Sequence, residues 1–121
     1  MSKISLRGKV QKGKNRGSNL GFPTANINLH KKIQEGIYIS TSKIGLKIYQ
    51  SLTFIGAAKT FGESKISAET YFLSNIGNIY GKWITVSLIK KIRNNQKFKS
   101  EKELISQMKK DREEAKKYFK I

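Results

Sequence analysis

Apolar and polar residues alternate along much of the first two-thirds of the chain, which is the pattern of half-buried β-strands. The segment from Ile4 to Val10 shows it first, with Ile4, Leu6 and Val10 on one face. Four further segments are rich in Ile, Tyr, Phe, Thr and Val and are separated by Gly or Asn: residues 36–42, 47–56, 66–73 and 81–92. Short strands at close spacing, with no helical pattern between them, predict a mainly β fold, a small closed antiparallel Greek-key-like β-barrel without exposed edges.

The pattern changes to helical spacing near the C-terminus. Ser100 and Glu103 form a capping box, in which the hydroxyl and the carboxylate each bond an orphan backbone N–H. Apolar residues then recur at helical spacing, at Leu104, Met108, Ala115 and Phe119. We therefore expect one amphipathic helix over about residues 100–119, packed on a barrel over about residues 1–95, within a single domain of residues 1–121.

A glycine-rich stretch runs from Gln11 to Asn26 and holds the only proline, Pro23. Its first part is one residue short of a phosphate-binding P-loop, because Asn15 stands where Ser or Thr would bind magnesium. No helix starts after it, as a P-loop requires. Such a loop can still cradle phosphates through its backbone N–H groups, although glycine loops are also common turns.

Thr24 and Asn26 follow this proline and project from the same side if the segment is extended. One hydroxyl and one amide oxygen are hard neutral ligands. They suit a Mg²⁺ ion that takes its remaining oxygens from water and a nucleotide. The competing interpretation is an Asn/Thr turn, and the two residues alone favour the turn.

The composition excludes several classes of chemistry. The 121 residues include no cysteine and one histidine, His30, which excludes disulfides, thiolate zinc sites, cysteine nucleophiles and imidazole metal clusters. No apolar run approaches the length of a membrane span, and the polar start of the chain is not a secretory signal. We expect a soluble cytoplasmic monomer without a membrane partner.

Positive charge dominates, with 25 Lys and Arg against 8 Asp and Glu and a net charge of +17. Such a field attracts polyanions such as nucleic acids and phosphorylated small molecules. Most of the basic residues are lysines, whereas bidentate recognition of phosphates and bases more often uses arginine. Solvated surface lysine is therefore favoured over a nucleic-acid groove.

Acidic residues outside the C-terminal helix are few. Glu35 and Glu63 adjoin glycines and are interpreted as solvated charges in turns. Glu69 instead lies inside an apolar strand, on the same face as Ser67 and Tyr71. It is either an outward-facing carboxylate paired with a lysine or a partly desolvated general base. The pattern alone favours the lysine-paired carboxylate.

Several motifs occur in an order that is found in one known family. They begin with Gly8-x-Val10-x-x-Gly13 and with Arg16-Gly17-Ser18-x-Leu20-Gly21-Phe22-Pro23-Thr24-Ala25-Asn26. They continue with Gly36-Ile37-Tyr38, Ile55-Gly56, Thr60-Phe61, Glu69-Thr70, Tyr80-Gly81, Ile92-Arg93 and Phe98. Together they resemble riboflavin kinases, which occur free-standing and as the C-terminal half of bacterial bifunctional riboflavin kinase/FAD synthetases. The fold of that family, a small antiparallel barrel with a C-terminal helix, agrees with the expectation above.

The resemblance implies ATP-dependent phosphorylation of the riboflavin 5′-hydroxyl, giving FMN and ADP. It implies that Thr24 and Asn26 hold Mg²⁺ and the ATP phosphates, and that Glu69 takes the proton from the 5′-hydroxyl. It implies Arg93 in the loop that closes over the flavin. The further residues implied at the nucleotide are Gly13, Gly17, Ser18, Gly21 and Tyr80. The adenylyltransferase half is absent from these residues, so FMN and not FAD is the expected product.

Three positions depart from the family pattern, and one of them is Lys59, which replaces the proline often found before the Thr-Phe pair. Asn78 stands where an acidic residue usually precedes the Tyr-Gly pair, and Asn95 stands where one commonly follows the arginine. Asp111, the only aspartate, falls on the apolar seam of the predicted helix. It either accepts hydrogen bonds from the barrel or faces a flavin pocket, and the structural role is favoured.

Two other functions stay open at this point. A small basic barrel can bind single-stranded nucleic acid through stacking aromatic residues, here Tyr71, Trp83 and Phe98. A kinase-like barrel can also bind flavin or nucleotide without turnover. The order of the glycine loop, Thr24, Asn26 and Glu69 favours the kinase, because a nucleic-acid binder has no need of it.

Overall fold

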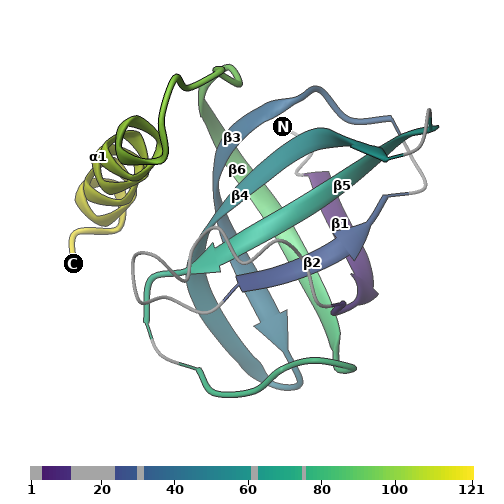
Figure 1. Ribbon diagram of the computed structural model, residues 1–121. Helices are drawn as coiled ribbons and strands as arrows, with labels where there is room; N and C mark the ends of the chain where they lie inside the picture. The colour runs from purple at the N-terminus through teal and green to yellow at the C-terminus, as the bar shows by residue number, and fades with distance from the viewer. Residues whose placement is uncertain (1–3, 12–23, 30–31, 61–62, 75) are drawn as a thin grey trace.

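The protein is described by a computed structural model that covers residues 4–11, 24–29, 32–60, 63–74 and 76–121 (Figure 1). The elements, in chain order, are β1 (Ile4–Lys9), β2 (Thr24–Asn28), β3 (Gly36–Ile44), β4 (Lys47–Thr60), β5 (Glu63–Phe72), β6 (Trp83–Arg93) and α1 (Glu101–Phe119). The predicted strands and the C-terminal helix are confirmed. The additional strand is β2, which begins within the stretch predicted as a loop.

The strands form one six-stranded sheet in the order β1-β6-β3-β4-β5-β2, with every neighbouring pair antiparallel. Consecutive strands β3, β4 and β5 form a meander, and β2 lies beside β5, which is a Greek-key arrangement. The sheet curls strongly, as Figure 1 shows. The expectation of a closed barrel is wrong: over the described residues, the edge strands β1 and β2 are joined only by an isolated bridge between Gln11 and Asn26. All five residues of β2 pair with β5, whereas its other edge has only this bridge among the described residues.

Apolar side chains fill both faces of the curled sheet. The inner face carries the main core, which includes Leu6, Val10, Ala25, Ile27, Ile55, Ala68, Phe72, Ile84 and Val86. The outer face of β3 and β4 packs with α1 in a second cluster built on Ile37, Ile39, Leu52 and Ala115. Partly buried side chains that extend this outer cluster include Phe54, Tyr71 and Leu73. The outer face of β5 is therefore partly shielded from water.

A chain of buried hydroxyl groups crosses the inner face of β3, β4 and β5. Ser42 bonds Ser51 at 2.9 Å, and Ser51 bonds Ser40 at 2.8 Å. Ser40 also bonds Thr53 at 2.8 Å, and Thr53 bonds Thr70 at 2.9 Å. Each hydroxyl can donate one hydrogen bond and accept others, so these hydroxyl groups satisfy one another, although single polar groups are costly to bury. Its last bond joins β4 to β5 at Thr70, the residue after Glu69, on the opposite face of the sheet.

Helix α1 begins where the sequence predicts it. Ser100 is the N-cap, and its hydroxyl accepts a 3.2 Å hydrogen bond from the backbone N–H of Glu103. The Glu103 carboxylate accepts from the backbone N–H of Lys99 at 3.1 Å, one residue before the expected donor. The buried residues of α1 are Met108, Asp111 and Ala115. Within the described ranges, no helix is long and apolar enough to span a bilayer.

Candidate functional site

The pairing of β2 with β5 brings the predicted metal ligands to the predicted base. Asn26 is the register partner of Glu69, and Thr24 is the partner of Tyr71. Directly opposite residues of an antiparallel pair have Cβ atoms about 4.5–5.5 Å apart and lie on one face. Thr24 is 9% exposed and Glu69 is 6% exposed, on the outer face of the sheet. A hydroxyl, an amide and a carboxylate thus share one small, partly dry surface.

The amide of Asn26 carries an unsatisfied acceptor. Its Oδ1 is buried and has no hydrogen-bond partner among the described residues. Leaving a buried acceptor unpaired costs about 1–3 kcal/mol. A cation bound at this oxygen removes that cost. The hydroxyl of the neighbouring Thr24 offers a second neutral oxygen as a metal ligand. These residues therefore fit a magnesium ion that takes its other ligands from a nucleotide and water.

Glu69 is held by a neighbour on its own strand. The Tyr71 hydroxyl donates a hydrogen bond to Oε1 of Glu69. Across the other side of β5, the register partner of Glu69 is Phe54 of β4. No lysine or arginine forms an ion pair with Glu69 in the part of the chain that the structure describes. The interpretation as a lysine-paired surface carboxylate, favoured by the pattern alone, is not what these contacts show.

Tyr80 lies at the end of β1 from which the glycine-rich stretch departs. The backbone N–H of Gly81 donates to the carbonyl of Val10 at 2.9 Å, and that of Val10 donates to the carbonyl of Lys82 at 2.8 Å. Gly81 has a φ of +82°, which a residue without a side chain adopts without strain. The Tyr80 side chain is 46% exposed.

Asn78 supports the same turn. Its Oδ1 accepts a 3.0 Å hydrogen bond from the backbone N–H of Tyr80. An amide oxygen supplies the acceptor that a carboxylate would supply at this position. The departure from the family pattern therefore leaves the turn intact.

The glycine-rich stretch supplies the other residues implied at the nucleotide. Gly13, Gly17, Ser18 and Gly21 lie outside the described residues. The chain enters this stretch at Gln11, whose backbone N–H donates to the carbonyl of Asn26 at 2.7 Å. The first residue of the stretch thus adjoins the candidate metal ligands.

Each nitrogen of the Arg93 guanidinium, at the end of β6, donates a hydrogen bond. Its Nε donates to Oδ1 of Asp111 at 2.9 Å, and its Nη2 donates to Oδ2 at 2.7 Å. Its Nη1 donates to the Asn94 carbonyl at 3.1 Å. Gln107 also donates to Oδ1 of Asp111, at 3.0 Å. This planar, bidentate pair joins the sheet to α1, so Asp111 has the structural role that the sequence favours.

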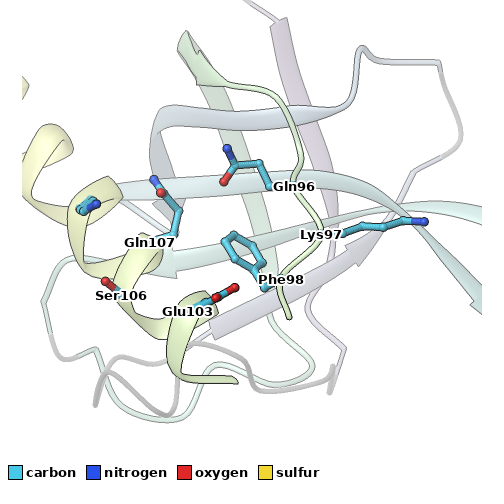
Figure 2. Close-up of a pocket in the computed structure, with 7 residues that line it drawn as sticks. Gln96, Lys97, Phe98, Glu103, Ser106 and Gln107 are labelled. Carbon is cyan, nitrogen blue, oxygen red and sulfur yellow. The ribbon is translucent and has the colours of Figure 1, made fainter. Parts of the chain in front are cut away.

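The loop after β6 borders a hollow of about 570 Å³ at the start of α1. Figure 2 shows Phe98 of the loop and Gln107 of α1 facing each other across it. Arg93 stacks over the Phe98 ring, with its guanidinium carbon 6.0 Å from the ring centroid. The other lining residues are Gln96, Lys97, Glu103, Ser106 and Lys110. Phe98 was singled out from the sequence through the family resemblance and as a stacking candidate. The polar lining was not predicted, because those residues look like ordinary solvated positions of a loop and a helix.

The same loop is attached beside Glu69. Asn95 donates from Nδ2 to the carbonyl of Ile55 at 3.1 Å. A Cβ on the next residue, Gly56, would lie 2.5 Å from the Phe54 ring and 3.4 Å from Nδ2 of Asn95. Phe54 is in turn the register partner of Glu69. The absence of a side chain at Gly56 lets the loop and the ring approach β4 next to the candidate base.

Comparison with known proteins identifies a family for this chain. A family model described as riboflavin kinase matches residues 1–119. The bifunctional riboflavin kinase/FMN adenylyltransferase of Bacillus subtilis is 33% identical over 120 residues, covering 94% of this chain and 38% of that protein. The chain spans well under half of the curated relatives it matches, 18% of one and 38% of another.

Solved structures share the fold. The crystal structure of riboflavin kinase from Trypanosoma brucei superposes with a TM-score of 0.66 at 26% identity, covering 99% of this chain and 82% of that chain. A crystal structure described as a macrolide-efflux protein from Streptococcus pneumoniae superposes with a TM-score of 0.79 at 30% identity, covering 93% of this chain and 38% of that chain. Since the family model matches residues 1–119 of this chain, the chain belongs to the riboflavin kinase family.

Proposed function

We propose that this chain transfers the γ-phosphoryl group of ATP to the 5′-hydroxyl of riboflavin, giving FMN and ADP. The observation that carries the proposal is the β2–β5 pairing, which sets Asn26 opposite Glu69 with Thr24 on the same face. The family membership supplies the substrate class, and the site supplies groups suited to the reaction.

The chemistry needs few protein groups. Phosphoryl transfer depends mainly on positioning and on neutralisation of the charge that spreads over the phosphoryl oxygens. Thr24 and Asn26 would hold Mg²⁺, which supplies that neutralisation when it is bound. The Glu69 carboxylate accepts the proton of the 5′-hydroxyl as the oxygen attacks phosphorus, and ADP leaves. General-base assistance of this kind typically contributes about 10²–10⁴-fold to the rate.

The nucleotide lies on the side of the site where β1 ends. There Tyr80 would adjoin the bound nucleotide, and the family resemblance implies the same role for Gly13, Gly17, Ser18 and Gly21, which lie outside the described residues. The excess of 25 basic over 8 acidic residues favours the capture of a polyanion such as ATP.

The flavin occupies the hollow beside α1. A volume of about 570 Å³ is within the range of small-molecule sites, roughly 300–1,000 Å³. The Phe98 ring offers a flat apolar face for an isoalloxazine, and Gln107 offers a polar contact. Arg93 contributes through its stack on Phe98 and its attachment to Asp111. Asn95 ties this loop to β4, the strand that carries the register partner of Glu69, which supports a flavin site near the base.

The nucleic-acid alternative is not favoured. Of its three candidate stacking residues, Tyr71 turns its hydroxyl to Glu69 and packs in the outer cluster. Phe98 lines the hollow at α1. Trp83 is 57% exposed, with Arg7 over its ring at 5.3 Å. The three rings therefore have separate surroundings.

The test is the conversion of riboflavin to FMN, followed by chromatography, in the presence of ATP and Mg²⁺. We expect turnover by the natural sequence and a loss of at least a hundredfold in kcat for Glu69→Gln. Riboflavin fluorescence titration should give the same affinity for both proteins. Glu35→Gln, at an exposed position, is the matched control and should keep full activity. No FMN from the natural sequence would refute the function, and full turnover by Glu69→Gln would refute the assignment of the base.

A further inference from the structure

Tyr71 holds the carboxylate of Glu69 by one of its two oxygens. The two residues are two positions apart on β5, so both side chains project from the outer face. The Tyr71 hydroxyl donates to Oε1 of Glu69. Among the described residues, no hydrogen bond reaches the other oxygen, Oε2. The carboxylate is thus fixed on one side and open on the other.

The tyrosine ring is itself immobilised. It packs in the outer cluster with Phe54 and Leu73. Its register partners are Leu52 on β4 and Thr24 on β2, so strands flank it on both sides. A ring held in this way presents its hydroxyl at one place, and little conformational entropy is lost when the hydrogen bond forms.

We propose that Tyr71 is the positioning residue for the general base. This inference rests on the proposed role of Glu69. By engaging Oε1, the phenol stops the carboxylate from rotating about its terminal torsion, a soft, roughly twofold torsion. Oε2 is then left in one orientation to accept the proton of a 5′-hydroxyl bound near Glu69 and Asn26, which are register partners. The hydrogen bond also replaces water around a carboxylate that is only 6% exposed.

A positioning role has a distinct kinetic consequence. Misplacement of a catalytic group by about 1 Å can cost on the order of a hundredfold in rate, and it leaves ground-state binding of the substrates unchanged. In the proposed arrangement the phenol acts on the substrates only through the carboxylate. Loss of its hydroxyl should therefore lower kcat and leave KM for riboflavin and for ATP unaltered.

Tyr71→Phe removes the hydroxyl and keeps the ring. We expect kcat for FMN formation to fall about tenfold, with both KM values within twofold of the natural protein. In the Glu69→Gln background, the same substitution should lower kcat by less than twofold, because the group that it positions is already disabled. Should the phenylalanine variant fail to fold, Tyr71→Met also lacks the donor and fills a similar volume.

Tyr38→Phe is the matched control. It deletes a phenol hydrogen bond, that of Tyr38 to the Gln34 carbonyl at 2.6 Å, on the inner face. It should leave kcat unchanged. A fall of threefold or more in kcat, specific to position 71 and without a change in KM, supports the positioning role. A smaller fall, or one matched by a rise in KM, overturns it and leaves the kinase assignment standing. Full turnover by Glu69→Gln overturns both.

Discussion

Asn26 lies directly opposite Glu69 across the β2–β5 pair, so an unsatisfied amide oxygen and a buried carboxylate face the same small space. The amide orients an oxygen without adding negative charge beside Glu69. A second carboxylate at this position would instead repel Glu69. A cation bound at Asn26 would attract the phosphates and leave the carboxylate to act on a proton.

The first prediction concerns the cost of Asn26 to the fold. Asn26→Leu has a similar size and removes a buried acceptor that the described residues leave unpaired. We expect the free energy of unfolding, measured in urea without ligands, to stay the same or to rise by about 1 kcal/mol. FMN formation at limiting Mg²⁺ should fall at least tenfold. Loss of stability together with full activity would show that the amide serves the fold and no metal.

The second prediction concerns the attachment of the loop that carries Phe98. Asp111→Asn keeps the size of the side chain and breaks the bidentate pair with Arg93. Removing one partner of a buried ion pair costs about 3–5 kcal/mol, and the 16% exposure of the Arg93 side chain places this case near the lower value. Because Arg93 stacks on Phe98, KM for riboflavin should rise severalfold.

ATP provides the internal control for this variant. In the proposed arrangement, ATP binds near Tyr80 at the end of β1 and does not contact the Arg93–Asp111 pair, so KM for ATP should stay within twofold. Steady-state kinetics at a temperature below the unfolding transition would separate the two effects. An equal rise in both KM values would contradict the assignment of this loop to the flavin.

Much of the fold follows from local sequence patterns. The alternation in residues 36–42 and the capping box at Ser100 are short-range features, and the structure confirms the elements that they predict. Strand β2 was harder to predict because its first residue, Thr24, directly follows Pro23 in a stretch dominated by turn formers. Its pairing with β5 depends on contacts between residues 39 to 47 positions apart, which no local pattern encodes.

The site shows the same division. Thr24, Asn26 and Glu69 were candidates from residue type and family resemblance, yet the residues alone favoured a turn and a surface charge. The observations that change this assessment require the folded structure: Glu69 is buried and accepts a hydrogen bond from a phenol on its own strand, and Asn26 has a buried oxygen. The sequence also could not show that Arg93 is occupied by Asp111, because a helix has to pack before the pair can form.

The third prediction tests the close approach at Gly56. Gly56→Ala would place a Cβ 2.5 Å from the ring of Phe54, which must then move. Phe54 is the register partner of Glu69, so we expect kcat to fall at least fivefold along with about 1–3 kcal/mol of stability. Gly45→Asn is the control, because a Cβ there meets nothing within 4 Å and Asn tolerates its φ of +61°. Unchanged kcat in Gly56→Ala would separate this contact from the chemistry.

The last prediction concerns the hydroxyl chain behind the site. Ser40 is fully buried and bonds both Ser51 and Thr53 at 2.8 Å, so Ser40→Ala leaves two hydroxyls with one partner fewer. We expect a loss of about 1–3 kcal/mol in the free energy of unfolding, measured by urea denaturation. Ser87→Ala removes a hydroxyl whose 3.4 Å contact with Ser5 lies on the outer face, and should cost less than about 0.5 kcal/mol. The same variant tests whether these hydroxyl groups also help to place Glu69, because their row ends at Thr70, the next residue. If they only support the sheet, kcat of Ser40→Ala below the unfolding transition will equal that of the natural protein. A fall in kcat there would mean that the hydroxyl groups help to place the base.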